Sequence, residues 1–325
     1  MADEGGYNDT NRAFLQAFMA HSTMTLGEAK PVLAAIFSVH EKREVLPEDV
    51  TEADLNSYIS GANTTISPFD LEIRSSLHQT THTRIYALVN TTSDPLTQLA
   101  TTYSADEIAF VKRVLDAMFE TYNTRRQEAM VVSSMQALQL AKPGSGSRQS
   151  MNRRESEGGT QGSLGQGLTM KEAESMMGRL VEEGWMEKSR KGFYSLSPRA
   201  LMELRAWLVS TYNDVDEGED EEDSGRVDKV KMCFACKEIV TVGQRCPQRL
   251  CAGRLHDICT RNFFRMQREE KCPVCKADWT GDNFVGERAI TTTDQYMAGR
   301  RRSGNTQRQV AEPEEEEEEE TINDG

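Results

Sequence analysis

The sequence predicts an α+β protein with two tandem winged-helix domains, followed by a cross-braced zinc module and a disordered acidic tail. Two observations predict this class. Three helical segments followed by a β-hairpin occur twice along the first two thirds of the chain. All seven cysteines then lie between residues 233 and 275, in pairs whose spacing suits metal binding.

Length and composition fit several domains joined by solvated segments. The chain has 325 residues, of which 37% are hydrophobic, and a formal net charge of −14. Two acidic runs, at 214–223 and 312–320, account for this charge, and the rest of the chain carries only about +2. The charge therefore says little about partners. Neither a secretory signal nor an apolar run of about 20 residues is visible, so we expect an intracellular protein with reduced thiols.

The first winged-helix domain is predicted over residues 8–92. Pro31 interrupts the apolar pattern of the second helix, so this helix is expected to start there, with proline in its first turn. Thr51 and Asp54 have the spacing of a capping box at the start of the third helix. The expected elements are helices at 11–20, within 25–40 from Pro31, and at 51–61, and a hairpin with strands at 69–77 and 83–90.

The second winged-helix domain is predicted over residues 93–212 and repeats this order. A Gly/Ser-rich flexible loop, 142–167, is expected before its third helix. Ser104 and Thr169 are expected helix caps, and Pro198 suits the first turn of a closing helix. The expected elements are helices at 104–122, 125–141 and 168–185, a hairpin at 185–197 and the closing helix at 198–212.

Winged helices often bind DNA, but the residues here favour protein docking. The third helix of the second domain carries Lys171 and Arg179 among four glutamates, so it has no phosphate-binding stripe. Its wing carries a modest basic patch of three cations, Lys188, Arg190 and Lys191. DNA contact through this wing is the weaker alternative.

An acidic linker, 213–230, is expected to lead into the cysteine module at 231–282, and residues 286–325 are expected to form a disordered tail. Seven cysteines and one histidine provide eight ligands, which suits two tetrahedral Zn²⁺ ions. In a cross-brace, the first and third ligand pairs bind one metal and the second and fourth pairs bind the other. Zinc 1 then has Cys233, Cys236, His256 and Cys259, and zinc 2 has Cys246, Cys251, Cys272 and Cys275. Four protein ligands at each metal predict structural sites without an open position for water.

This C4HC3 ligand order suits either a RING finger or a PHD finger. PHD fingers usually carry tryptophan two residues before the seventh ligand, where this chain has Glu270. RING fingers often carry proline directly after the seventh ligand, and Pro273 occupies that position. A C4HC3 variant RING finger is therefore favoured.

In RING fingers, an apolar surface grips a ubiquitin-conjugating enzyme. The matching positions here are Phe234, Ala235, Phe263, Phe264 and Pro273. We expect one of the two central phenylalanines to pack inside the module and the other to face the enzyme. Lys276 resembles the basic residue that holds the conjugated ubiquitin in its reactive pose. Such a ligase acts by positioning, and we predict no catalytic residue that forms a covalent intermediate.

From about residue 8 to 285, the chain resembles a family of RING-bearing subunits of the SMC5–SMC6 genome-maintenance complex, non-structural maintenance of chromosomes element 1. The resemblance rests on the tandem winged helices, the C4HC3 order and the closing segment "KCPVCKADW" with Trp279. It implies a nuclear, chromatin-associated protein with a MAGE-type winged-helix partner and a kleisin-type partner. It also implies roles in DNA repair and recombination, and an E3 ubiquitin ligase activity that the MAGE-type partner promotes.

Two other functions stay open. The first knuckle reads "CFAC", with Ala235 where RING fingers often have isoleucine or leucine. This departure favours a non-catalytic, zinc-stapled docking subunit of the same complex. A histone-tail reader is the other alternative, and the missing PHD tryptophan counts against it.

Overall fold

The computed structural model describes residues 8–91, 102–143, 167–213 and 228–298. Within these ranges the chain forms three three-stranded antiparallel sheets, one in each folded unit, with helices packed around them. No helix in the described ranges is both long enough and apolar enough to cross a membrane. The predicted α+β class, with two winged helices before a cysteine-rich module, is confirmed.

The first winged-helix unit has three helices and a sheet in the order β1-β3-β2. The predicted hairpin is confirmed, because Leu71 pairs with Asn90 and Leu77 pairs with Arg84. Phe14, Phe18 and Leu33 are fully buried between the helices and form the centre of this unit's core. The elements are α1 (Asp9–His21), β1 (Thr23–Thr25), α2 (Leu26–Glu41), η1 (Pro47–Asp49), α3 (Glu52–Ile66), η2 (Ser67–Phe69), β2 (Leu71–Leu77) and β3 (Arg84–Asn90).

The prediction that the second helix starts at Pro31 is wrong. Helix α2 begins at Leu26, because Thr25 and Glu28 form a capping box that satisfies the first free N–H groups. Pro31 lies inside the helix, where it removes a single N–H donor. Strand β1 was not predicted, since three residues are too few to show alternation, and its pairing with β3 is a tertiary contact.

The second winged-helix unit has the sheet order β4-β6-β5. Phe110, Met118 and Leu180 are buried in its core. The predicted closing helix is divided at Leu204 into two helices. The elements are α5 (Ala105–Asp116), η3 (Ala117–Thr121), β4 (Val132–Ser133), α6 (Ser134–Gln139), α8 (Met170–Glu182), β5 (Met186–Lys188), β6 (Phe193–Leu196), α9 (Pro198–Glu203) and α10 (Arg205–Asn213).

The helix predicted at 125–141 is mostly wrong. Only α6 is helical, because the capping box of Ser133 and Gln136 sets its start. The residues before it form a turn closed by a bridge between Asn123 and Glu128, and then strand β4. The flexible loop predicted at 142–167 lies almost entirely outside the described residues.

The cysteine module contains a small sheet, in the order β8-β7-β9, and one central helix. Strand β9 extends the folded module past the predicted end at residue 282. Residues 286–298 were predicted to belong to a disordered tail, and this is wrong. Helix α12 packs there, with Thr291 buried. The elements are β7 (Gly243–Arg245), β8 (Arg254–Leu255), α11 (Asp257–Gln267), β9 (Phe284–Val285) and α12 (Glu287–Thr291).

The predicted acidic linker and the rest of the predicted tail fall largely outside the described residues. Of the linker 213–230, the structure describes Asn213 and residues 228–230. Val230 is buried there, and its backbone N–H and carbonyl both bond to the Asn213 side chain. Residues 299–325, which hold the Arg300–Arg302 cluster and the glutamate run, are not described.

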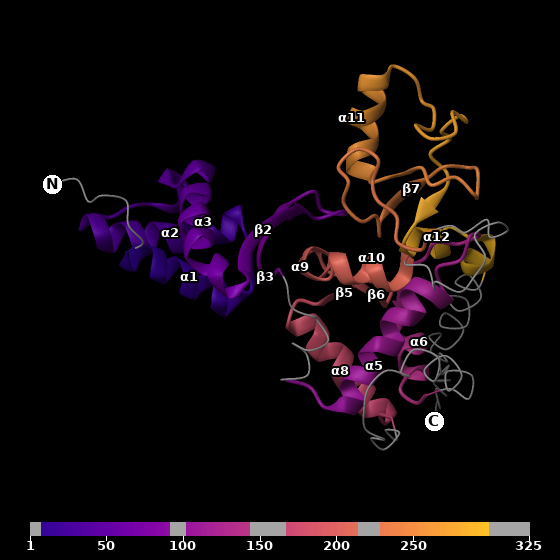
Figure 1. Cartoon of the computed structure of the whole chain (residues 1–325), viewed down its shortest axis with the longest axis horizontal. Helices are drawn as coiled ribbons and strands as arrows, with labels where there is room; N and C mark the ends of the chain where they lie inside the picture. Colours follow the sequence, from indigo (N-terminus) through magenta and orange to yellow (C-terminus); the bar gives the residue numbers. More distant parts are fainter. Residues whose placement is uncertain (1–7, 92–101, 144–166, 214–227, 299–325) are drawn as a thin grey trace, which may run out of the picture.

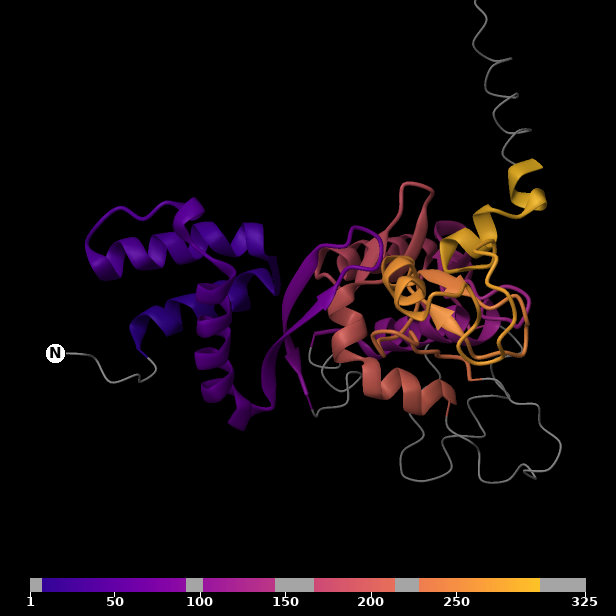
Figure 2. The same ribbon diagram turned by 90° about the horizontal axis from the view of Figure 1, so that it is seen from above.

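The first winged-helix unit lies to one side of the molecule, and its β2–β3 hairpin reaches across to the other two units (Figure 1). The view from above shows the same hairpin beside the second winged helix (Figure 2). Helix α9 packs against β3 at this contact. The second winged helix and the cysteine module share one continuous apolar core, so they form a single packed body.

Candidate zinc centres and the surface around them

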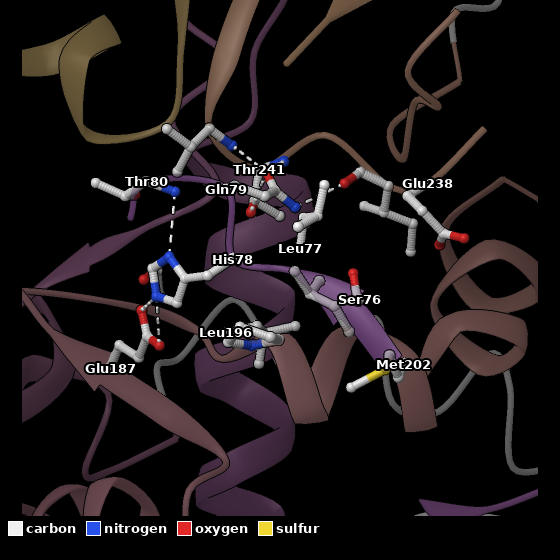
Figure 3. A pocket seen from close by; sticks show the side chains of 15 residues that line it. Ser76, Leu77, His78, Gln79, Thr80, Glu187, Leu196, Met202, Glu238 and Thr241 are labelled. Carbon is white, nitrogen blue, oxygen red and sulfur yellow. Dashed lines mark hydrogen bonds and ion pairs between the residues drawn. The ribbon is translucent and has the colours of Figure 1, made fainter. Parts of the chain in front are cut away.

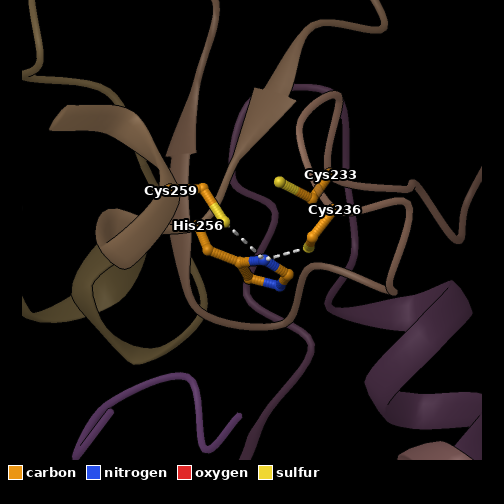
Figure 4. A group of neighbouring side chains, drawn as sticks. All are labelled: Cys233, Cys236, His256 and Cys259. Carbon is orange, nitrogen blue, oxygen red and sulfur yellow. Dashed lines mark hydrogen bonds between the residues drawn. The ribbon is translucent and has the colours of Figure 1, made fainter. Parts of the chain in front are cut away.

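The first cluster joins the first and third ligand pairs. Cys233 and Cys236 lie on a turn, His256 is the N-cap residue of α11, and Cys259 lies in the first turn of that helix. The four ligand atoms lie within 4.8 Å of one another. The Nδ1 atom of His256 is 3.2 Å from the sulfur of Cys236 and 3.9 Å from that of Cys259 (Figure 4).

The second cluster joins the second and fourth pairs. It brings together Cys246, Cys251, Cys272 and Cys275, again with their ligand atoms within 4.8 Å. The Sγ atoms of Cys246 and Cys275 are 3.4 Å apart, and those of Cys251 and Cys272 are 3.5 Å apart. The structure thus brings the eight ligands together in the two interleaved groups that the sequence predicts.

The geometry of both clusters fits zinc. A tetrahedral Zn²⁺ with its usual bond lengths separates neighbouring ligand atoms by about 3.5–3.8 Å. The distances in the two clusters bracket that range, and thiolate and imidazole are the donors that zinc prefers. The ligands fill all four positions at each site, so the sites are structural.

Both Cys-x2-Cys knuckles share one backbone form. The residue after the second cysteine, Lys237 or Lys276, has a left-handed backbone with φ near +60°. Its N–H donates to the carbonyl of the first cysteine, at 2.9 Å for Cys233 and 3.0 Å for Cys272. This turn aims both sulfurs of a pair to the same side.

A glycine between the ligands leaves room for the second cluster. A Cβ atom on Gly253 would lie 2.6 Å from the sulfur of Cys272, well inside contact distance. The N–H of Gly253 is 3.4 Å from the sulfur of Cys251 and points to it. Such N–H···S contacts stabilise thiolates and are typical of structural zinc sites.

The predicted enzyme-binding residues divide into exposed and buried ones. Phe264 is 8% exposed and packs against Trp279, with ring centroids 5.6 Å apart. Because it is part of the core, Phe264 is not available for a partner. Phe263 is half-buried and meets Phe234, which is 40% exposed, with centroids 5.9 Å apart. These two rings form an exposed aromatic pair beside zinc 1.

The remaining predicted positions lie on the two knuckles. Ala235 is exposed on the first knuckle. Pro273 is half-buried on the second, next to Val274, which is 50% exposed. The Nζ of Lys276 is exposed and donates to the carbonyl of Pro273 at 3.3 Å. Because Lys276 is exposed, an anionic group on a bound partner can reach it.

A buried charge cluster, which no sequence pattern predicted, joins the module to the second winged helix. The carboxylate of Glu128 accepts a hydrogen bond from Lys231 at 2.6 Å. It also accepts two from Arg254, one from Nε at 2.6 Å and one from Nη2. Arg245 lies 3.6 Å from the same carboxylate and donates to the carbonyl of Arg125. More than 100 residues separate Glu128 from these cations along the chain, so no local sequence pattern indicates the cluster.

These contacts set the ionisation of Glu128. Burial alone would raise the pKa of a carboxyl group that is 2% exposed. The hydrogen bonds and charges of Arg254 and Lys231 outweigh burial and lower the pKa of Glu128 below its usual value. The carboxylate is therefore charged at neutral pH and holds the two units together as an ion cluster.

The basic wing of the second domain is partly engaged inside the molecule. Lys191 donates to the hydroxyl of Thr291 at 3.1 Å and pairs with Glu287 at 3.4 Å, both on α12. Lys188 lies over the ring of Tyr194. Arg190 is exposed. Because α12 binds part of the wing, the surface left for a DNA phosphate backbone is small.

Two winged helices in tandem and a closed two-zinc module define the class of protein: a winged-helix protein with a RING-like domain. Residues 233–275 match the family described as RING-like domain. Residues 11–204 match the family described as Nse1 non-SMC component of SMC5-6 complex. The chain therefore belongs to this Nse1 family.

Individual relatives agree with this assignment. The chain is 23% identical to the non-structural maintenance of chromosomes element 1 homolog of Rattus norvegicus over 278 residues, which are 86% of each chain. It is 22% identical to the element 1 protein of Schizosaccharomyces pombe, over 87% of this chain and 97% of the other. A solved structure titled Nse1-Nse3-Nse4 complex has the same fold, with a TM-score of 0.61 and 22% identity over 84% of this chain and 97% of that chain.

Proposed function

We propose that this protein is a subunit of an SMC5–SMC6 complex, in which it docks a MAGE-type winged-helix subunit and a kleisin-type subunit. Membership of the Nse1 family supports this role, and so does the likeness to a chain of a complex titled with Nse1, Nse3 and Nse4. The acidic α8 and the partly covered wing favour protein partners over DNA for the winged helices. Co-purification with the two expected subunits tests the proposal, and a chain that associates with neither would contradict it.

Within this complex, the RING-like module acts as an E3 ubiquitin ligase by positioning a ubiquitin-charged conjugating enzyme. The observation that supports this most is the exposed pair Phe234–Phe263, held beside the zinc 1 cluster. Lys276, on the second knuckle, is placed to hold the ubiquitin. All seven cysteines belong to the two clusters, so the ligase uses no covalent thioester of its own and transfer depends on proximity alone.

The experiment is ubiquitin discharge from a charged conjugating enzyme, with and without the MAGE-type partner. Replacing Phe234 and Phe263 together by alanine is expected to reduce the discharge rate at least tenfold, because the aromatic anchors of an interface carry most of its binding energy. Met266→Ala is the matched control, since Met266 lies on the same helix and is 83% exposed. Both variants must keep two zinc ions.

The second candidate function is a non-catalytic docking subunit. The small, exposed Ala235 favours it, because this side chain offers little apolar area to a conjugating enzyme. If the parent protein and the double variant both leave the discharge rate at that of the conjugating enzyme and partner alone, the docking function is correct and the ligase proposal fails.

A nuclear, chromatin-bound location and a role in DNA repair and recombination follow from the proposed complex. Fluorescence microscopy of the tagged protein, before and after DNA damage, tests both. A diffuse signal outside the nucleus that damage does not change would contradict this part of the proposal.

A further inference from the structure

The tip of the β2–β3 hairpin inserts between the other two units (Figure 3). On one side of the tip, Nε2 of His78 donates to the carboxylate of Glu187 on β5 at 2.9 Å. On the other side, the amide of Gln79 meets the backbone of residues 239–242 in the cysteine module. The side chain of Gln79, which is neutral, thus joins the first winged helix to the module by hydrogen bonds.

Both the nitrogen and the oxygen of the Gln79 amide make hydrogen bonds. Its Nε2 donates to the carbonyl of Ile239 at 2.8 Å. Its Oε1 accepts from the N–H of Thr241 at 3.0 Å, from the N–H of Val242 at 2.8 Å and from the Thr241 hydroxyl at 3.2 Å. Among the described residues, no other acceptor is found for these two N–H groups, and Thr241 is only 3% exposed. Without the amide, the two N–H groups would lose their partner in a site with little access to water.

The carbonyl oxygen of Ile239 also accepts a hydrogen bond from a zinc ligand. The Nε2 of His256 donates to the same oxygen at 3.1 Å. This bond fixes the imidazole tautomer in which Nδ1 is unprotonated and faces the sulfurs of the first cluster. Ile239 also lies on the segment that follows the first knuckle, where an isolated β-bridge pairs it with Met232. One carbonyl therefore orients the histidine ligand and is itself held by Gln79.

In the part of the chain that the structure describes, no ligand of the second cluster shares a hydrogen-bond partner with Gln79. Its ligand Cys246 lies after β7, and Cys272 and Cys275 lie on the other knuckle. The partners of Gln79 that the structure shows all lie in residues 239–242, on the segment that follows the first knuckle. Loss of the amide should therefore loosen zinc 1 and leave zinc 2 as it is.

We propose that Gln79 is a positioning residue for zinc 1, supplied by the first winged helix: through the Ile239 carbonyl it orients His256, and this amide contact thereby sets how tightly the first zinc is held. Partners that move the first winged helix would then change metal retention in the module. This inference does not depend on ligase activity, so it stands whether the module is catalytic or only a docking surface.

The test uses the full chain loaded with two metal ions and the variant Gln79→Ala. Release of zinc to a chromogenic chelator is followed in time, and ¹¹³Cd NMR of the cadmium-substituted protein separates a site with three sulfurs and one nitrogen from a site with four sulfurs. We expect the release rate from the Cys₃His site to rise about tenfold, in line with losses of outer ligand contacts elsewhere. The Cys₄ site should keep its resonance and its release rate.

Three matched variants make the result specific. Thr80→Ala changes an exposed neighbour on the same loop and should release zinc like the parent. His78→Ala removes the contact with Glu187 and keeps the amide, and it should also leave zinc 1 unchanged. Gln79→Glu keeps an acceptor for the two N–H groups but cannot donate to Ile239, and it should release zinc 1 faster than the parent.

Three outcomes would overturn the proposal. The first is unchanged release from both sites in Gln79→Ala. The second is an equal acceleration at both sites, which would mean a general loss of stability. An effect of His78→Ala as large as that of Gln79→Ala would likewise show that hairpin docking, and not the amide, holds the metal.

Discussion

At the scale of single residues, close packing around the zinc ligands leaves little freedom for substitution. Gly253 lies between two ligands of zinc 2, and the sulfur of Cys272 occupies the space where a side chain would begin. The backbone of Gly253 has an ordinary φ, so the constraint here is space and not conformation. A small change at this position therefore acts directly on the geometry of the metal site.

We expect Gly253→Ala to remove zinc 2 or to weaken its binding at least tenfold, because the added methyl group displaces the sulfur of Cys272. Zinc content by atomic absorption and ¹¹³Cd NMR report the loss. Gly178→Ala is the control, since no atom lies within 4 Å of a Cβ there and alanine favours the helix. Two intact cadmium resonances in Gly253→Ala would contradict the steric argument.

Glu128 is the residue on which the contact between the second winged helix and the module depends most. Glu128→Gln leaves Lys231, Arg245 and Arg254 buried without their counter-charge. We expect the free energy of unfolding to fall by about 3–5 kcal/mol, measured by urea denaturation at pH 7. Glu269→Gln, in an exposed pair with Lys271, should change it by less than about 0.5 kcal/mol.

The same carboxylate should make the parent sensitive to acid. Because its pKa is lowered in the folded state, its contribution is fully present above the unfolded pKa, near 4.5, and is lost as pH falls through the folded value. The Gln variant lacks this term, so the stability difference between the two proteins should shrink at low pH. A difference that stays constant from pH 7 to pH 3 would refute this assignment.

At the scale of elements, residues 286–296 form a strap, a segment that connects the module to the second winged helix. The N–H of Gly286 donates to the carbonyl of Glu128 at 2.8 Å, and the Gln127 amide donates to the carbonyl of Ala289 at 3.0 Å. Ile290 and Tyr296 pack against the buried cluster of Ala129, Val131 and Phe193. Helix α12 thereby ties the module to the wing of the second domain.

Truncation after Val285 tests the strap. We expect it to lower the free energy of unfolding by about 2–4 kcal/mol, the value of burying one or two large apolar side chains. A chain that ends at residue 298 keeps α12 and is the control, with stability close to that of the full chain. Equal stability of the two truncated chains would show that α12 contributes nothing.

At the scale of the whole molecule, the two largest apolar cores lie in different parts of the fold. The core of the first winged helix, around Phe14 and Leu33, is separate. The second winged helix and the module share a core that runs from Phe110 to Trp279. Zinc binding therefore supports the second body directly, and the β2–β3 hairpin connects that body to the first winged helix.

The purified protein should hold two zinc ions per chain, and chelation should unfold residues 231–285, since structural zinc contributes on the order of 10 kcal/mol to folding. Hydrogen exchange is expected to show rapid exchange in the module and its neighbours, while α1, α2 and α3 stay protected. A module that keeps its protection after the metal is removed would contradict the structural role of zinc.

Local chemistry explains which parts of the fold were predictable. The capping boxes of Thr51 and Thr169, the hairpin before Asn90 and the paired cysteines are all signals within a few residues. The helix predicted from residue 125 does not form in the turn at 123–131, because cations of the module hold Glu128 there. The tail prediction failed because Ile290 and Tyr296 have partners more than 90 residues away.

The sequence by itself determined the class of the protein, the two groups of zinc ligands and the family, because ligand spacing and helix caps act over short distances. Only the tertiary structure decided that Phe264 is buried while Phe263 is accessible, that Glu128 joins two units, and that Gln79 reaches the module. These features depend on residues that are distant in the chain and meet only when the units pack. Burial and hydrogen-bond satisfaction select those contacts, and a linear pattern does not record them.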